Sequence, residues 1–242
     1  MTHAEPDLPL DGLLVLDCSR MLPGAVLARQ MLDLGARLIK VEHPSGGDPM
    51  RQVPPQVDGI GAAFAALYPG AESLALDLQV ADDAALFEEV LRGADVLVET
   101  FRPGTLARWG FGAERCLEMN PKLVYCSMSS WGARGAAAGR VGHDLNFVAS
   151  TGLLELVGST GIPAVQMADV GAALLASSAI LAALLRRERT GRGAVIDQPL
   201  VSGAAPLLAW AWADQAAGGG ALHTLLSGEV AVLPEIPLRR RP

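Results

Sequence analysis

Residues 13–43, LLVLDCSRMLPGAVLARQMLDLGARLIKVEH, contain the pattern from which the fold follows. They begin with a short run of strand-forming residues (13–17), and a segment whose apolar residues have helical spacing follows and ends at Gly35. A second run of strand-forming residues occupies 37–43. Strand, helix and strand within about thirty residues is the length of one βαβ unit. We therefore expect two parallel strands joined by a helix.

The same alternation continues along the chain. Three further runs have the composition of strands: SLALDL (73–78), ADVLVET (94–100) and KLVYCSMS (122–129). Helical patterns over 81–94 and 112–121 separate them. Alternating strands and helices predict an α/β fold, a parallel sheet with helices on both of its faces.

The C-terminal third contains two apolar helical patterns. A segment punctuated by glycine and proline leads to Asp169, and a long helix follows whose most apolar run covers 170–185. A short run, AVIDQPL (194–200), separates it from a last helix expected over 201–217. The sixteen residues of 170–185 are fewer than the roughly 20 that a membrane helix needs, and basic residues follow them, so we expect a buried helix.

Composition limits the possible partners. The length of 242 residues suggests one large domain or one and a half, and 50% hydrophobic with 19% charged residues suits a substantial core. The net charge of −7 offers no general attraction for nucleic acid or an anionic membrane, so an anionic ligand would need a local basic cluster. Neither a signal peptide nor a metal-ligand spacing is recognisable, and the three cysteines are expected to be buried, reduced thiols in a cytoplasmic protein.

Polar residues follow several of the expected strands, where an open parallel sheet binds its ligands. The turn FRPGTLAR has Arg102 and Arg108 at its two ends. Two guanidinium groups could clamp phosphates, because each matches phosphate oxygens bidentately. The same turn could equally be a solvated loop with two surface arginines.

His143 and Asp169 are candidates for an acid–base pair, but each also has an ordinary structural explanation. Asp169 precedes an apolar helix and could be its N-cap, and Asp144 could cap a helix that begins at Leu145. A single histidine is more often structural than catalytic. The residues by themselves leave the choice open.

Taken together, the motifs resemble the family III CoA-transferases of the CaiB/BaiF type, which include formyl-CoA transferase and 2-methylacyl-CoA racemase. The resemblance runs over roughly residues 8–215, in the order of these blocks: LPLDGLLVLDCSRMLPG, DLGARLIKVEHPSGGDPMR, SLALDL, ADVLVETFRPGTLARWGFG, NPKLVYCSMSSWG, GHDLNF and LAALLRRERTGRGAVIDQPLVSG. Each block alone is a weak signal, but the occurrence of all of them in the family's order makes the resemblance specific.

The resemblance implies a Rossmann-like large domain over 8–217 that binds acyl-CoA, and a homodimer of two interlocked chains. It implies a CoA thioester as the substrate and no tightly bound cofactor or metal. Asp169 matches the family's catalytic aspartate. The motif Gly142-His143-Asp144 matches the position at which racemase-like members carry a second, histidine base.

Racemisation or epimerisation of a 2-methyl-branched acyl-CoA is the activity that this pair favours. Inverting the α-carbon requires a proton to leave one face and another to arrive on the opposite face, which two groups with working pKa values near neutrality can do. The alternative is an acyl-CoA:carboxylate CoA-transferase, in which Asp169 is the nucleophile that attacks the thioester.

The resemblance also assigns contacts to CoA, at His43, Thr100, Phe101, Arg102, Arg108 and Arg140. The chain departs from the family pattern in three places. LYPGAES stands where many members have a basic stretch, Gln79 stands where a lysine is frequent, and ARGAAAG stands where Gly-Pro is usual. These departures predict weaker contacts to phosphate.

The end of the chain departs further. Members of the family continue into a smaller domain, which in the racemases supplies a glutamate that orients the histidine, so we expect a chain that lacks most of that domain. Residues 218–242 are expected to be a linker and an irregular tail. With GC-rich codons, a shift of one base turns 232–242 into Cys-Tyr-Arg-Lys-Tyr-Arg-Cys-Ala-Asp-Gly, which resembles the family's entry into that domain and suggests a frameshift. A non-catalytic, CoA-binding fragment is therefore a third alternative.

Overall fold

The computed structural model describes residues 8–157 and 162–219. The chain divides into two compact units, the first ending at Ala204 and the second beginning at Ala205. The expected domain over 8–217 stays a prediction. The residues of the suggested frameshift lie outside the described part of the chain.

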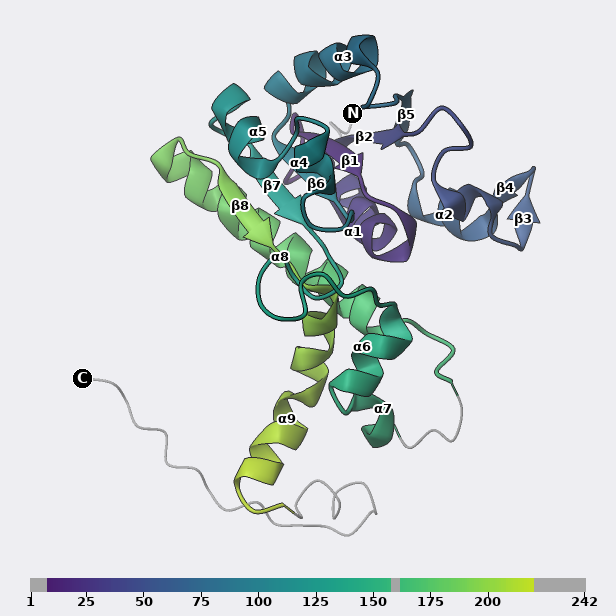
Figure 1. Cartoon of the computed structure of the whole chain (residues 1–242), viewed down its shortest axis with the longest axis vertical. Coiled ribbons are helices and arrows are strands. Elements are labelled where there is room, and N and C mark those ends of the chain that lie inside the picture. The colour runs from purple at the N-terminus through teal and green to yellow at the C-terminus, as the bar shows by residue number, and fades with distance from the viewer. Residues whose placement is uncertain (1–7, 158–161, 220–242) are drawn as a thin grey trace, which may run out of the picture. The chain divides into compact units, whose positions relative to one another are not determined.

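A six-stranded parallel sheet forms the centre of the first unit (Figure 1). Its strands are β1 (Leu14–Cys18), β2 (Arg37–Glu42), β5 (Glu72–Ala75), β6 (Val96–Glu99), β7 (Val124–Ser127) and β8 (Ala194–Asp197). They lie in the order β5-β2-β1-β6-β7-β8, and every neighbouring pair is parallel. The order runs outward in both directions from β1, as in doubly wound nucleotide-binding folds. The predicted Rossmann-like α/β fold is confirmed.

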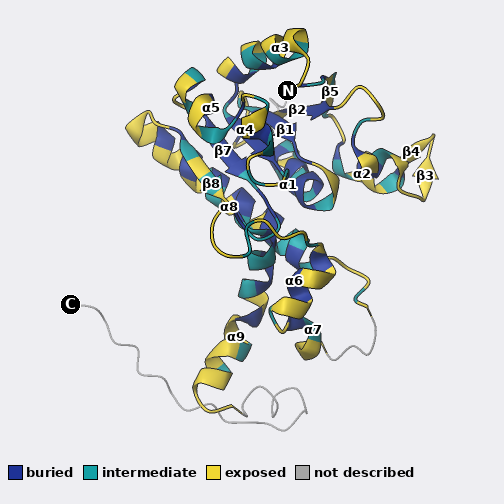
Figure 2. Cartoon of the chain, in the orientation of Figure 1, coloured by how far each residue is buried: buried dark blue, intermediate teal, exposed yellow. Residues whose placement is uncertain are grey.

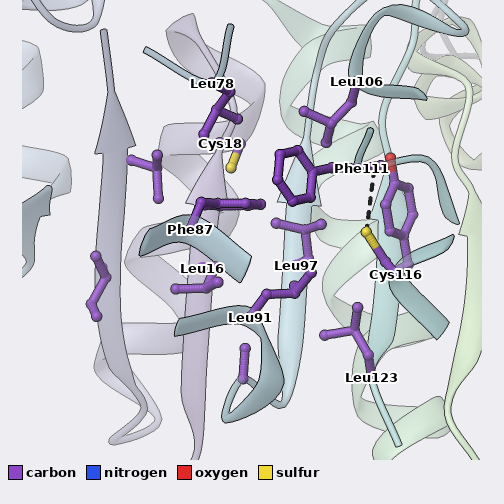
Figure 3. Close-up of a cluster of buried hydrophobic side chains, with 14 of the residues drawn as sticks. Leu16, Cys18, Leu78, Phe87, Leu91, Leu97, Leu106, Phe111, Cys116 and Leu123 are labelled. Carbon is purple, nitrogen blue, oxygen red and sulfur yellow. Dashed lines mark hydrogen bonds between the residues drawn. The ribbon is translucent and has the colours of Figure 1, made fainter. Parts of the chain in front are cut away.

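The main hydrophobic core lies between the sheet and the helices α3 (Ala81–Arg92) and α5 (Ala113–Met119). Figure 3 shows Leu16 and Leu97 of the central strands pointing at Phe87 of α3. The short helix α4 (Thr105–Arg108) leads into this core, where the ring of Phe111 packs edge-on against Phe87 with 4.7 Å between centroids. Because alternate strand residues point to one face, this core uses only half of each strand.

The helices α1 (Met21–Asp33) and α8 (Met167–Thr190) pack against each other away from that core, so the sheet is covered on both faces. The buried side of α8 is made largely of alanine, which allows neighbouring backbones to approach closely (Figure 2). In the described chain α8 is the one helix long and apolar enough to cross a membrane, a test that core helices also pass.

Several elements differ from the sequence-based expectation. The segment before Asp169 contains α6 (Asp144–Ser150) and α7 (Leu153–Leu156), and α8 begins at Met167, three residues earlier than expected. The helix expected over 201–217 is divided into a 3-10 helix, η2 (Leu200–Ala204), and α9 (Ala205–Ala216). Pro206 explains the division, because proline fits the first turn of a helix but cannot supply an interior N–H.

The remaining described elements form a small excursion between β2 and β5. They are the 3-10 helix η1 (Pro49–Gln52), the hairpin strands β3 (Gln56–Val57) and β4 (Ile60–Gly61), and α2 (Ala62–Leu67). The three cysteines are buried and free, as expected. Within the described ranges, no cluster of three His, Cys, Asp or Glu residues is placed to hold a metal ion.

Candidate active site

The loops after β1 and β6 meet at the centre of the sheet, where the strand order reverses. The backbone N–H of Arg20 donates to Thr100 Oγ1 at 2.7 Å and so joins the two loops. Ligands of open α/β sheets bind at such a point, beyond the carboxyl ends of the strands. The candidate site therefore lies where the fold leaves a crevice.

Three cavities lie along this edge of the sheet. The first has a volume of about 250 Å³ and is lined by His43, Gln79 and Phe101, among others. The second, of about 440 Å³, shares Phe101 with the first. The third, of about 560 Å³, shares Thr100 with the second. The three cavities are therefore neighbours that share wall residues.

The structure distributes the predicted site residues among these cavities. His43 lines the first cavity, and the other five expected CoA contacts line the second: Thr100, Phe101, Arg102, Arg108 and Arg140. His143 and Asp169 both line the third cavity. Eight residues spread over 127 positions of sequence, from 43 to 169, are thus brought to one edge of the sheet.

The arginines of the second cavity are exposed and positioned by neutral neighbours. Arg108 donates to Thr105 Oγ1 at 3.1 Å, and the guanidinium of Arg140 lies 5.2 Å from the centre of the Trp131 ring. Neither these two nor Arg102 forms an ion pair with a carboxylate in the described ranges. Their positive charge is therefore available to an anionic ligand.

His43 is held differently. Its Nδ1 accepts the N–H of Ser45 at 3.1 Å, and its Nε2 lies 3.5 Å from Asp77 Oδ2. His43 and Gln79 both line the first cavity. Both ring nitrogens of His43 therefore have a polar neighbour within the protein, and these neighbours orient the ring.

Asp169 lies in the first turn of α8, two residues after Met167. It is not the N-cap of this helix, because Gln166 holds that position. The cap comes instead from Asp144, whose Oδ1 accepts the N–H of Ala168 at 2.7 Å and that of Asp169 at 2.9 Å. The suggestion that Asp144 caps its own helix is also wrong, since His143 is the N-cap of α6.

The environment of the Asp169 carboxyl group disfavours its ionised form. Its Oδ1 is buried and has no hydrogen-bond partner among the residues that the structure describes. Burial, followed by the neighbouring charge of Asp144, raises the pKa of Asp169 to about 7. A carboxyl group with this pKa can both accept and release a proton at neutral pH.

Gly142, the first residue of the Gly-His-Asp motif, allows close packing beneath His143. A Cβ at this position would lie 2.7 Å from the ring of Phe147 and 3.1 Å from the indole nitrogen of Trp131. The two rings meet edge to face, with 5.3 Å between centroids. A side chain at 142 would displace this pair and the residues that follow it.

The sequence-based analysis did not select a buried ionic network below the loop after β1. Lys40 is 1% exposed, and its ammonium group lies 3.4 Å from Asp17 Oδ2 and 3.2 Å from Asp48 Oδ2. It also donates to the carbonyl oxygen of Ser19. Asp48 in turn accepts the N–H of Met21, which has a φ of 63°. The network thus fixes the loop that forms one wall of the site.

Arg20 and Ser130 are the other site residues without an assigned role. Arg20 lines the first and third cavities, and Ser130 lines the second and third. Both follow central strands, and the sequence placed them among the polar residues after the expected strands without giving them a role. The charged side chain of Lys40 within an apolar strand, LIKVE, was a signal that could have identified it.

The fold and the site together define a protein of the doubly wound α/β class, with an arginine-lined crevice and a protonatable carboxyl at its end. The family described as CoA-transferase family III matches residues 10–234, and the chain belongs to this family. The family that the sequence motifs indicated is therefore confirmed.

Relatives of both expected activities match the chain. It is 38% identical over 207 residues to an acetyl-CoA:oxalate CoA-transferase of Acetobacter aceti, covering 84% of this chain and 53% of that protein. It is 33% identical over 213 residues to the human alpha-methylacyl-CoA racemase, covering 86% of this chain and 52% of the racemase. The chain spans about half the length of these curated relatives.

A solved structure of the same kind matches the fold. A CAIB/BAIF family protein from Brucella suis has a TM-score of 0.81 and 33% sequence identity, and the match covers 92% of this chain and 58% of that one.

Proposed function

We propose that this protein racemises or epimerises 2-methyl-branched acyl-CoA thioesters, with Asp169 and His143 as the two proton-transferring groups. The observation that carries the proposal is that both side chains line one cavity, in which Asp169 is the buried carboxyl whose pKa is raised to about 7. General acid–base catalysis is most effective when the pKa of the catalytic group lies near the working pH.

The reaction needs one proton to leave and one to arrive. The α-proton of the thioester passes to one of the two groups, and the electron pair delocalises onto the thioester oxygen. The other group then donates its proton to the opposite face of the α-carbon. The thioester bond stays intact, and the two groups exchange protonation states, which makes the reaction reversible.

The walls of the third cavity suit an apolar acyl chain. Besides its polar groups it is lined by Met21, Leu145, Ile162 and Val165, all of them exposed in the described chain. A branched hydrocarbon chain would cover this apolar surface and gain free energy from leaving water. The arginines of the second cavity would hold the phosphates of CoA at the other end.

Acyl-CoA:carboxylate CoA transfer is the second candidate. The unpartnered Oδ1 of Asp169 favours it, because a carboxylate without hydrogen-bond donors keeps its electron pairs available for attack on a thioester carbon. The similarity to the Acetobacter aceti protein supports it as well. In this reaction His143 would be a neighbour of the site without a proton to transfer.

We also propose that the protein acts as a cytoplasmic homodimer, which rests on the resemblance to its family. Size-exclusion chromatography with light scattering would test the dimer. A monomer over the whole working range of concentration would contradict it.

Two incubations separate the candidate reactions. A single stereoisomer of a 2-methylacyl-CoA is incubated with the protein alone, and then with free carboxylates such as oxalate, succinate and glutarate. Loss of stereochemical purity without a carboxylate is the expected result. Transfer of CoA that requires a carboxylate would replace the proposal with the second candidate. If neither reaction is observed, both candidates are wrong, and the third alternative, a non-catalytic CoA-binding fragment, is left.

A further inference from the structure

The Gly-His-Asp segment and the helix that bears Asp169 are joined by a single side chain. Asp144 is 7% exposed, and its Oδ1 bridges the N–H groups of Ala168 and Asp169 at 2.7 and 2.9 Å. These are N–H groups of the first turn of α8, a helix of 24 residues. The donors of this turn thus point at a carboxylate that comes from another helix.

An aspartate in the first turn of a helix is normally stabilised as an anion. The free N–H groups and the helix dipole attract its negative charge and lower its pKa. Asp169 does not benefit in this way, because its Oδ1 has no hydrogen-bond partner in the described chain. Two N–H groups of this turn, those of Ala168 and Asp169, are occupied by Asp144.

We propose that Asp144 is a positioning residue for Asp169, which occupies the N–H donors at the start of α8 and presents a second negative charge to the reactive carboxyl group. This inference rests on the proposed function of Asp169. It assigns the third residue of the Gly-His-Asp motif a distinct task, which is to keep the carboxyl at 169 ready to take up a proton.

The other charges of the third cavity do not replace Asp144 in this task. Among the described lining residues, Arg20 and Arg102 are positive and His143 can become so, and a positive charge would favour the ionised form of Asp169. The negative charge that opposes ionisation comes from Asp144. Removing the charge of Asp144 should therefore lower the pKa of Asp169.

In the described chain, the other elements packed against α8 contribute no charge to the shift in the pKa of Asp169. In the described chain η2 has no ionisable side chain, and β7 has only the neutral Tyr125 and Cys126. The charged residues of α1, Arg29 and Asp33, pair with each other at 2.8 Å. Asp197 of β8 accepts a backbone N–H from a loop.

Direct titration of Asp169 tests the inference without relying on activity. The protein is labelled with aspartate that carries ¹³C in its side-chain carboxyl, and the resonance of Asp169 is identified by its loss in Asp169→Asn. Asp144→Asn keeps an oxygen that can accept both N–H groups, but it removes the charge. We expect its titration midpoint for Asp169 to fall by about one pH unit.

A matched control and a second variant make the outcome decisive. Asp11→Asn removes an exposed carboxylate and should leave the midpoint where it is. Asp144→Ser, which also caps helices well, gives the same test if the asparagine variant does not fold. An unchanged midpoint in a folded variant would overturn the inference, because a purely structural cap would alter stability and leave the titration of Asp169 as it was.

The acid limb of the pH–rate profile for α-proton exchange should move in the same direction as the titration. A shifted midpoint in a protein without any exchange activity would leave the role of Asp144 intact and would contradict the proposed function. Exchange whose pH profile is the same in the parent and in Asp144→Asn would count against the role of Asp144 alone.

Discussion

Gly203 lies so close to α8 that a Cβ at this position would be 1.9 Å from the carbonyl oxygen of Ala168. The contact is reciprocal, since a Cβ on Gly171 would be 2.2 Å from the carbonyl oxygen of Gly203. Two backbones therefore touch directly, one residue before Asp169 and two residues after it. The orientation of the first turn of α8 depends on this contact as much as on the cap from Asp144.

Gly203→Ala should therefore be strongly destabilising. The added methyl group meets backbone atoms, which cannot rotate away, so the cost should be about 3 kcal/mol or more. Urea unfolding measures it. Gly93→Ala is the matched control, because a Cβ there would make only an ordinary contact of 3.7 Å with Val90. Equal stability of the two variants would contradict the close packing of η2 on α8.

Asp169→Asn should increase stability at alkaline pH. The pKa of Asp169 is raised from 3.8 to about 7 by folding, so ionisation of the folded protein is costly. The penalty is absent below about pH 4, grows as the pH rises, and is complete above about pH 7. An uncharged asparagine avoids it, and the free energy of unfolding at about pH 8 should rise by about 2 to 4 kcal/mol, the lower figure allowing for solvent screening of a partly exposed group.

The check is a pair of urea titrations, one at about pH 8 and one at about pH 4, for the parent and for Asp169→Asn. The difference between the two proteins should be present at the higher pH and disappear at the lower one. Asp11→Asn, at an exposed position, should show little difference at either pH. A constant difference at both values would mean that folding does not raise the pKa of Asp169.

Replacing Arg102, Arg108 or Arg140 by glutamine should weaken the binding of CoA. An exposed ion pair contributes at most about 1 kcal/mol, which corresponds to about a fivefold change in Kd for each arginine. Calorimetric titration with CoA at two salt concentrations measures the effect, which should shrink at the higher salt. Arg115→Gln, on the far helix α5, should bind CoA as the parent does.

The sheet could be predicted from the sequence because its strands are short apolar runs whose spacing is local. The ends of the strands were predicted less accurately, as β5 shows. The run SLALDL was expected to be a strand throughout, but the strand ends at Ala75 while Leu76 and Leu78 continue into the core. Apolar residues are needed both in the strand and in the buried loop that follows it, so composition alone cannot show where the strand ends.

The two residues predicted as an acid–base pair, His143 and Asp169, line one cavity, and their catalytic roles stay a prediction. The cap on α8 was not predicted, because it joins residues 144 and 169 through the fold and not through a local pattern. Lys40 is a similar case, because its two carboxylate partners come from a different strand and a different loop. Interactions between distant residues decide where such groups point.

The exchange of the α-proton tests the central claim most directly. The protein is incubated with a 2-methylacyl-CoA in D₂O, and deuterium at the α-carbon is followed by mass spectrometry, with Asp169→Ala, His143→Ala and the remote Arg115→Gln in parallel. We predict exchange in the parent and in Arg115→Gln, and a loss of about 10²-fold or more in each of the two site variants. The absence of exchange in a folded parent that binds CoA, or exchange that survives both site substitutions, would contradict the assignment of Asp169 and His143 as an acid–base pair.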